Sequence, residues 1–198
     1  MIRTARLDLL PATPALARAD LAGREALAAA LGVEVPGTWP PDLFDAPAIE
    51  YALKRLEADP RQAGWWYYYV VLRAEAVLVG IVGYKGPPVD GTVEIGYGVL
   101  AEHQRCGYAT EASAALVARA FERPDVDRVV AETLPELAPS IGVMERLGFA
   151  FVGEGSEPGV IRYALERGRS AAALPPYGAA RADRRRSTSN GPSGGART

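Results

Sequence analysis

The chain has 198 residues, 48% of them hydrophobic, which suits one domain with a sizeable core. Its formal net charge of −2 at pH 7 excludes a global field that would recruit nucleic acid or an anionic membrane, and no apolar run approaches the roughly 20 residues that span a bilayer. One cysteine cannot form an intramolecular disulfide, and the N-terminus lacks the pattern of a secretory signal, so we expect a cytoplasmic protein.

The first third of the chain predicts one strand and two helices. Residues 5–10 alternate enough to form a strand. Thr13 as N-cap, Pro14 at the first helical position and Gly32 just past the end then predict one continuous helix, rich in Ala and Leu. After a loop broken by prolines, residues 48–59 carry apolar side chains at helical spacing and predict a second helix.

The centre of the chain changes to β-structure. Residues 65–73 and 76–85 are β-branched and aromatic, with only Ala74 and Glu75 between them, which predicts a hairpin. Residues 92–100 follow a turn rich in Gly and Pro, and they predict a third consecutive antiparallel strand.

The last third predicts two helices and three strands. Helices are expected over 107–122 and 138–148, and strands over 127–133, 149–154 and 159–166. The plan is therefore strands, helix, strand, helix, strands.

A change of composition marks the end of the predicted domain. We expect one α/β domain over residues 1–167 and a disordered tail over 168–198, where Ala, Arg, Ser, Gly and Pro offer little to bury. The basic run 184–186 could contact RNA or an acidic surface, but a solvated tail is the preferred interpretation.

The segment HQRCGYATEA, residues 103–112, places a Gly-containing turn directly before a predicted helix. Backbone amides in such a turn point the same way and the helix dipole adds about half a positive charge, a geometry that binds phosphate. Gly107 allows close backbone approach, the small Ala109 opens the first helical turn, and Arg105 adds a mobile positive charge. An ordinary strand-to-helix connection is the alternative. Residues 96–101 match G-x-G-x-x-A but lie inside a strand, and no P-loop pattern occurs, which disfavours both nucleotide-binding alternatives.

Three segments of the chain resemble the GNAT N-acetyltransferase superfamily. QRCGYA, residues 104–109, matches the [QR]-x-x-G-x-[GA] pyrophosphate loop, and GYATEA is the form common in the branch similar to bacterial ribosomal-protein N-terminal acetyltransferases. APSIGVMERLGF (138–149) resembles the second signature of that branch, and TARLDLLP (4–11) resembles its opening strand. The resemblance covers roughly residues 3–166, which include every predicted element.

This resemblance implies a mixed, mostly antiparallel central sheet with helices on both faces. Strand 92–100 would splay from strand 127–133, and the pantetheine arm of acetyl-CoA would lie in the slot against the backbone of residues 97–100. An amide near Val99 would polarise the thioester carbonyl. The expected cofactor-binding residues are Tyr97, Val99, Leu100, Gln104, Arg105, Cys106, Gly107, Tyr108, Ala109, Thr110 and Ser140.

Two residues are candidates for catalysis. Glu94 stands where many relatives carry a catalytic glutamate and would act as the base for the amine, although it could also be a salt-bridged strand residue. Ser140 would protonate the departing thiolate or, alternatively, cap its helix. The chain departs from the family at Leu137, usually an Asn that helps hold the pantetheine arm, and at Met144, a Tyr acid in some relatives.

The expected partners are acetyl-CoA and a primary amine, either a protein N-terminal α-amine or a small-molecule amine. Glu94 and Trp39 are the candidate acceptor-binding residues, although Trp39 could instead fasten its loop to the domain. The half of the aromatic cluster 65–69 that faces away from the core would also line the acceptor cleft. We expect no metal, membrane or nucleic acid, and a homodimer is left open. A non-catalytic domain of the same fold that binds acyl-CoA or a protein is the alternative function.

Overall fold

The structure is a computed structural model that describes residues 1–168. Its main elements, in chain order, are β1 (Ile2–Arg3), β2 (Leu7–Pro11), α1 (Pro14–Ala22), α2 (Arg24–Leu31), α3 (Ala46–Ala58), β3 (Tyr67–Leu72), β4 (Val77–Tyr84), β5 (Thr92–Val99), α4 (Tyr108–Phe121), β6 (Arg128–Thr133), α5 (Ala138–Arg146), β7 (Ala150–Glu154) and β8 (Ile161–Glu166). The tail predicted over 168–198 lies outside the described residues, apart from Gly168.

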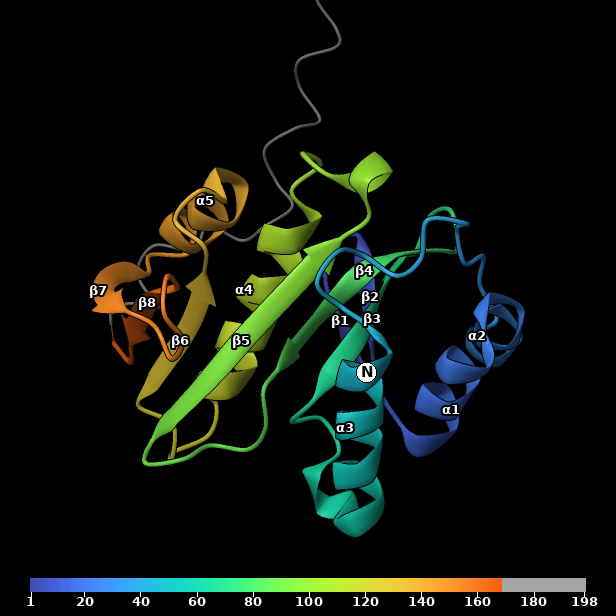
Figure 1. Ribbon diagram of the computed structural model, residues 1–198, viewed down its shortest axis with the longest axis horizontal. Coiled ribbons are helices and arrows are strands. Elements are labelled where there is room, and N and C mark those ends of the chain that lie inside the picture. Colours follow the sequence, from blue (N-terminus) through green and yellow to red (C-terminus); the bar gives the residue numbers. More distant parts are fainter. Residues whose placement is uncertain (169–198) are drawn as a thin grey trace, which may run out of the picture.

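An eight-stranded sheet in the order β1-β2-β3-β4-β5-β6-β8-β7 organises these elements (Figure 1). Every neighbouring pair is antiparallel except β5 and β6, which run parallel. The mixed, mostly antiparallel sheet, the β3–β4 hairpin and the antiparallel position of β5 are therefore confirmed. A parallel pair requires a crossover connection, and α4 supplies it between β5 and β6.

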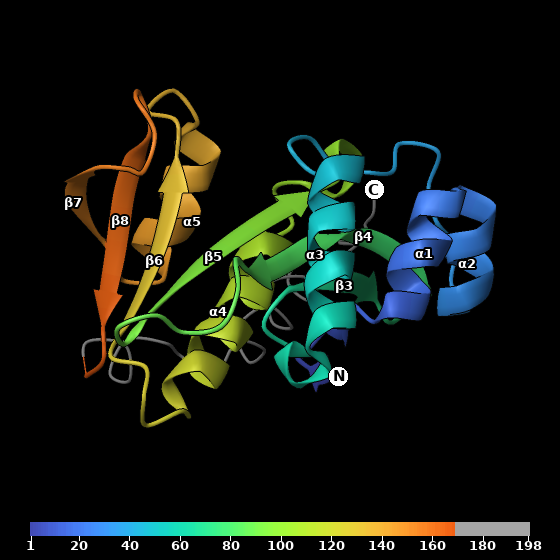
Figure 2. The same cartoon turned by 60° about the horizontal axis from the view of Figure 1, so that its bottom comes forward.

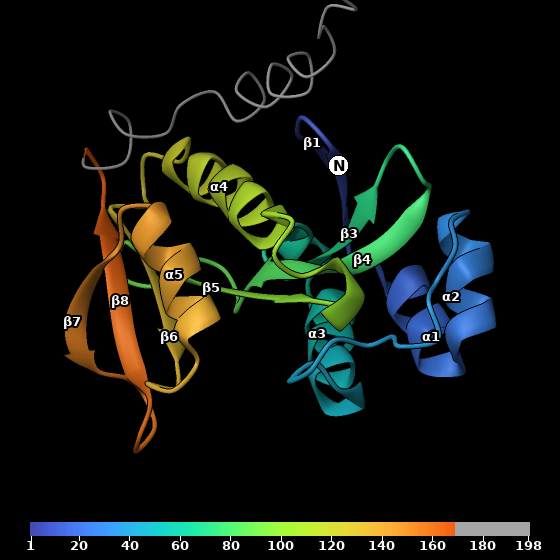
Figure 3. The same cartoon turned by 90° about the horizontal axis from the view of Figure 1, so that it is seen from above.

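Helices cover both faces of the sheet, as expected. Seen from above in Figure 3, α4 lies on one side of the strands and α1, α2 and α3 lie on the other. The helices α1 to α3 pack against β2, β3 and β4, and they do not extend over β6, β7 and β8 (Figure 2). That half of the sheet keeps an open face.

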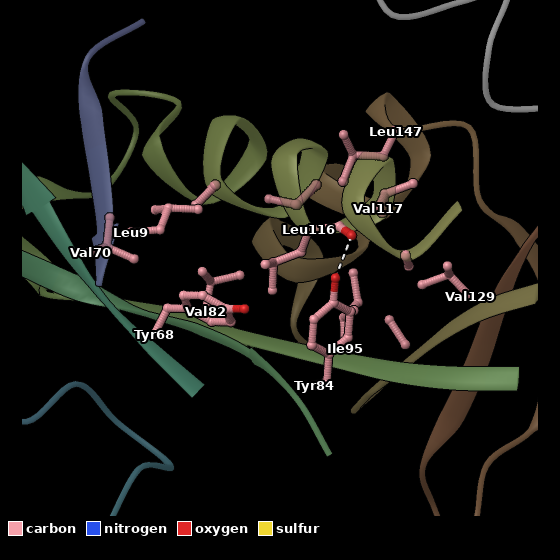
Figure 4. Close-up of a cluster of buried hydrophobic side chains, with 14 of the residues drawn as sticks. Leu9, Tyr68, Val70, Val82, Tyr84, Ile95, Leu116, Val117, Val129 and Leu147 are labelled. Atoms are coloured by element: carbon pink, nitrogen blue, oxygen red, sulfur yellow. Dashed lines mark hydrogen bonds between the residues drawn. The ribbon is translucent and has the colours of Figure 1, made fainter. Parts of the chain in front are cut away.

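The larger core lies between the sheet and helices α4 and α5 (Figure 4). Leu116, Val117 and Ala120 of α4 are fully buried, as their helical spacing predicts. The hydroxyl of Tyr84 on β4 donates a hydrogen bond of 2.6 Å to the carbonyl oxygen of Leu116. Each fully buried large apolar side chain contributes about 1.5–3 kcal/mol. This packing fixes α4, and with it the loop that begins the helix, against the sheet.

The second core holds the remaining aromatic residues. Tyr67 and Tyr69 point from β3 toward α1, α2 and α3, and Tyr68 points to the opposite core. Tyr69 is fully buried and Tyr67 is 7% exposed. The prediction that the outward half of the aromatic cluster lines an acceptor cleft is therefore wrong for Tyr67 and Tyr69, because three helices cover that part of the sheet.

The helical region after β2 differs from the prediction at one residue. Gly23 has a φ of 119°, open to glycine but not to most side chains, and it divides the predicted helix into α1 and α2. The predicted ends are confirmed: the Thr13 side chain accepts a hydrogen bond from the amide of Leu16, and Gly32 is left-handed with a φ of 69°.

Candidate active site

Strand β5 pairs with β6 along only half of its length. Their parallel register runs from Thr92 opposite Arg128 to Ile95 opposite Ala131, whereas β5 remains paired with β4 as far as Val99. Figures 1 and 2 both show the two strands together at one end and apart at the other. The predicted splay is present, and the edge of β5 past Ile95 has no neighbouring strand.

Backbone direction decides which residues of β5 face this slot. The carbonyl of Glu94 accepts a hydrogen bond from the amide of Lys85, and the amide of Leu100 donates to the carbonyl of Val79, so both residues bond toward β4. Successive residues of a strand bond to opposite sides, so Tyr97 and Val99 face the slot. The predicted pairing of residues 97–100 with pantetheine narrows to these two, because the backbones of Gly98 and Leu100 face β4.

A hydrogen-bonded pair spans the slot between β5 and α5. The Tyr97 hydroxyl donates to the carbonyl oxygen of Ser140 at 2.9 Å and lies 3.1 Å from its Oγ. A hydroxyl has one proton and a carbonyl oxygen can only accept, so Ser140 is the donor in the second contact. Burial raises the pKa of Tyr97, which keeps that hydroxyl neutral. The alternative that Ser140 caps α5 is wrong, since Leu137 occupies the N-cap position.

The loop before α4 presents a cluster of unpartnered amides. Arg105 and Gly107 have φ values of 59° and 81°, in the left-handed region on either side of Cys106. Among the described residues, the backbone amides of 105–110 find no hydrogen-bond acceptor. Turns of this kind at a helix N-terminus form anion-binding concavities. The Gln104 side chain donates to the carbonyl of Val99 at 3.1 Å and joins the loop to the slot.

The side chains of the loop divide into exposed and packed groups. Arg105 and the free thiol of Cys106 are exposed, Ala109 is half-buried and Thr110 is buried. The Tyr108 ring lies 4.6 Å from the guanidinium carbon of Arg6, which itself comes from the segment before β2. The loop therefore offers its backbone and small side chains to a ligand, while the Tyr108 ring packs against Arg6.

The other face of β5 carries Glu94, which lies beside a pocket of about 720 Å³. The pocket is lined by Lys85, Gly86, Pro87, Val89, Thr92, Val93, Glu94, Arg128, Val130, Val152, Glu154, Arg162 and Ala164. Glu94 is 21% exposed and forms an ion pair with Lys85. The salt-bridged alternative for Glu94 is therefore present in the resting structure, and its position beside the pocket leaves the predicted role as a base open to test.

A second carboxylate near the point where β5 and β6 separate, that of Glu132, is fully engaged in hydrogen bonds. Glu132 of β6 accepts hydrogen bonds from the amide of Ser156 at 2.9 Å, from its hydroxyl at 2.6 Å and from Arg162 at 2.7 Å. Burial raises the pKa of Glu132, but these hydrogen bonds outweigh it and hold the pKa below its usual value. A carboxylate so bound is a poor base. Glu132 instead fastens the turn between β7 and β8.

Trp39 anchors the loop between α2 and α3. Its indole nitrogen donates to the carboxylate of Asp20 at 2.8 Å, and its ring packs against Phe44 and Tyr69. Pro41 of the same loop lies against β5, where a Cβ added at Gly98 would meet its ring at 3.2 Å. The role of Trp39 in binding the acceptor stays a prediction, and its visible contacts position the loop beside β5.

The geometry of the slot, the amide loop and the opposing pocket agrees with one family. Residues 6–150 match the acetyltransferase (GNAT) domain. The chain belongs to the GNAT family. It is also 33% identical over 121 residues to the uncharacterized N-acetyltransferase YjdG of Bacillus subtilis (strain 168), a match that covers 60% of this chain and 71% of that relative.

Solved GNAT structures share the fold. The ribosomal-protein-S5-alanine acetyltransferase from Vibrio fischeri is similar with a TM-score of 0.58 and 18% identity, over 88% of this chain and 98% of that one. RimL, a ribosomal L7/L12 α-N-protein acetyltransferase in complex with coenzyme A, gives a TM-score of 0.55 and 20% identity, over 82% and 95%. At these identities the likeness establishes the fold.

GNAT enzymes take their acetyl group from acetyl-CoA, so this protein is an acetyltransferase. The residues present fit that donor, because unpartnered amides gather at the loop and the backbones of Tyr97 and Val99 face the slot. Leu137, at the start of α5, is 36% exposed and cannot hydrogen-bond a pantetheine amide. Met144 is 1% exposed and belongs to the core.

No helix within residues 1–168 is long and apolar enough to span a membrane. Over the same part of the chain, no group of three or more His, Cys, Asp or Glu side chains is arranged to hold a metal ion.

Sequence reasoning missed three residues of the site, Lys85, Arg6 and Glu111. Lys85 pairs with Glu94, and Arg6 and Glu111 meet beside the loop. For Glu111 a signal existed, since this carboxylate stands among buried residues of an amphipathic helix and is itself 2% exposed. The partners of all three side chains lie in other segments, so spacing alone does not reveal them.

A carboxylate at the loop should abolish binding of the donor. We expect Ala109→Asp to remove measurable acetyl-CoA binding in calorimetry, because the new charge would oppose the pyrophosphate at the first turn of α4. Ala118→Asp is the matched control, on an exposed position of the same helix, and should bind normally. If Ala109→Asp bound acetyl-CoA with wild-type affinity, the assignment of the pyrophosphate to this loop would be wrong.

Proposed function

We propose that the enzyme acetylates a protein N-terminal α-amine and that the acceptor enters through the pocket beside Glu94. The observation that carries this proposal is the position of β5 between two openings. Tyr97 and Val99 face the slot that fits the donor, while Glu94 lies on the face opposite α4 and lines a pocket. The pocket volume of about 720 Å³ lies within the usual range for ligand sites.

The chemistry of the acceptor favours an α-amine. Only a neutral amine attacks a thioester, and an α-amino group with a pKa of about 8 keeps roughly a tenth of its molecules neutral at pH 7. A lysine amine, with a pKa of about 10.4, needs far more help. The pocket lining carries two carboxylates, Glu94 and Glu154, and three cations, Lys85, Arg128 and Arg162. Its charge therefore does not select the acceptor, and the preference for an α-amine rests on the pKa of the amine. A small-molecule amine is the second candidate acceptor.

Glu94 is the proposed base. A water held between its carboxylate and the attacking nitrogen would pass on the proton as the carbon–nitrogen bond forms. Lys85, which also lines the pocket, forms an ion pair with this carboxylate at rest.

Ser140 is the proposed acid for the leaving thiolate. Its hydroxyl projects beside the slot and is held by Tyr97, and Met144 is buried and offers no proton. As the carbon–sulfur bond breaks, the Ser140 hydroxyl would turn from Tyr97 to the sulfur and donate its proton, and solvent would return a proton to Oγ, while the neutral Tyr97 hydroxyl stays bonded to the Ser140 carbonyl.

A non-catalytic domain that binds acyl-CoA is the competing function. It is favoured by Leu137 and Met144, the two positions at which the sequence departs from the family pattern. Acetyl-CoA binding without turnover on any acceptor would support it.

An acceptor panel should separate the amine classes. We expect release of free thiol from acetyl-CoA with peptides that carry a free N-terminus. Peptides of the same sequence with a blocked N-terminus and an internal lysine should give none at pH 7, because their amine is almost fully protonated. Turnover with small amines alone would overturn the peptide assignment.

Replacing the proposed base should produce a pH-dependent defect. We expect Glu94→Gln to keep acetyl-CoA binding and to lower kcat at pH 7 by up to about 10²–10⁴-fold. The loss should shrink as rising pH deprotonates the amine without assistance, measured as a kcat profile from pH 6 to about 9.5.

Lys85→Gln distinguishes a base from an ion-pair partner. If Glu94 serves only to hold Lys85, this variant should lose as much activity as Glu94→Gln. A much smaller loss is expected. A flat Glu94→Gln profile at the wild-type rate would remove Glu94 from the mechanism.

The proposed acid can be tested at Ser140. We expect Ser140→Ala to lower kcat by at least about tenfold with little change in acetyl-CoA affinity, and Ser140→Thr to recover part of the loss. Ser156→Ala, which removes an exposed hydroxyl from Glu132, is the control. Equal kcat in Ser140→Ala and the wild type would assign thiolate protonation to solvent.

A further inference from the structure

A buried carboxylate of α4 forms hydrogen bonds with the segment before β2. Glu111 is 2% exposed, and its Oε1 accepts hydrogen bonds from the Thr4 hydroxyl at 2.6 Å and from the Arg6 amide at 2.8 Å. Its Oε2 accepts from Nε of Arg6 at 2.7 Å. The hydrogen bonds to the Glu111 carboxylate thus come from a segment more than a hundred residues away in sequence.

Arg6 continues from this carboxylate to the phosphate loop. Its Nη1 donates to the carbonyl oxygen of Cys106 at 3.0 Å, and its guanidinium carbon lies 4.6 Å from the centre of the Tyr108 ring. One side chain therefore connects a buried carboxylate with the two residues on either side of Gly107.

The bond to the Cys106 carbonyl also sets the direction of an amide. A peptide unit is planar and trans, so its carbonyl and its N–H point in opposite directions. The carbonyl of Cys106 points to Arg6, and the amide of Gly107 in the same peptide unit therefore points away from Arg6. That amide is one of those that find no acceptor among residues 1–168.

Backbone strain in the loop explains why the hydrogen bond from Arg6 is needed. Arg105 has a φ of 59°, a conformation that costs a non-glycine residue about 1–3 kcal/mol and persists only where the surrounding structure holds it. The charge of Glu111, in the first turn of α4, would also oppose a phosphate. Burial raises the pKa of Glu111, but the hydrogen bonds from Thr4 and Arg6 lower it by more, so the net pKa lies below its usual value. The group is therefore a carboxylate, and Arg6 balances its charge.

We propose that Arg6 and Glu111 are positioning residues for the donor pyrophosphate: Glu111 fixes Arg6, and Arg6 fixes the Cys106–Gly107 peptide with its amide toward the phosphate. This inference rests on the proposed placement of the acetyl-CoA pyrophosphate at this loop. It assigns to the opening segment of the chain a role in donor affinity, without contact between that segment and the acetyl group.

The test compares a donor with pyrophosphate and a donor without it. We expect Arg6→Gln to weaken coenzyme A binding in calorimetry, and to lower kcat/KM for acetyl-CoA, by about tenfold, the effect of one charge-assisted hydrogen bond. The same variant should use S-acetylpantetheine as well as the wild type does, because that donor lacks the phosphates. Arg6→Lys should recover part of the coenzyme A affinity.

Matched variants separate positioning from folding. Arg3→Gln breaks an exposed ion pair with Asp8 in the same segment, and it should leave kcat/KM unchanged with both donors. Glu111→Gln should reproduce the selective loss of coenzyme A affinity. If this variant fails to fold, the Arg6 variants still test the proposal, because the Arg6 side chain is 41% exposed.

Two contrary results have different meanings. If the wild type prefers acetyl-CoA to S-acetylpantetheine and Arg6→Gln retains the whole preference, or loses activity equally with both donors, the positioning role is overturned. If the wild type itself shows no preference for acetyl-CoA, the placement of pyrophosphate at this loop fails, and the inference fails with it.

Discussion

The end of the β5–β6 pairing after Ile95 is the constraint on which the site depends. Backbone groups that leave a sheet need other partners, because burial without a hydrogen bond is costly. At Val99 the carbonyl is satisfied by Gln104, and the amides that face the slot are available to a ligand. The parallel register also requires a crossover through α4, which places the N-terminus of that helix at the same end of β5.

The alternation of β5 divides the site between two faces. Val93 and Ile95 are buried under α4 and hold the strand in place, while Glu94, between them, points to the opposite face. The helices α1 to α3 cover β2 to β4 and leave the pocket open beyond them. In the proposed function, donor and acceptor would therefore approach β5 from different sides.

Local patterns predicted most elements because each depends on neighbouring residues. The Thr13 cap, the Gly32 end and the apolar stripe of α4 were all recognisable from spacing and are confirmed. Gly23 was missed because a glycine within an Ala-rich run is compatible with a continuous helix. The fate of Tyr67 and Tyr69 depended on whether helices cover their face of the sheet, and periodicity does not record which elements lie above a strand.

By itself the sequence determined the order of elements, the amide-rich loop before α4 and, through its motifs, the family and the acetyl donor. The tertiary structure decided which groups meet: Glu94 with Lys85, Tyr97 with Ser140, and Glu111 with Arg6. The physical reason is range. Helical and strand periodicities act over a few residues, whereas these pairs depend on strand register and helix packing, which place residues as far as 105 positions apart in hydrogen-bonding contact.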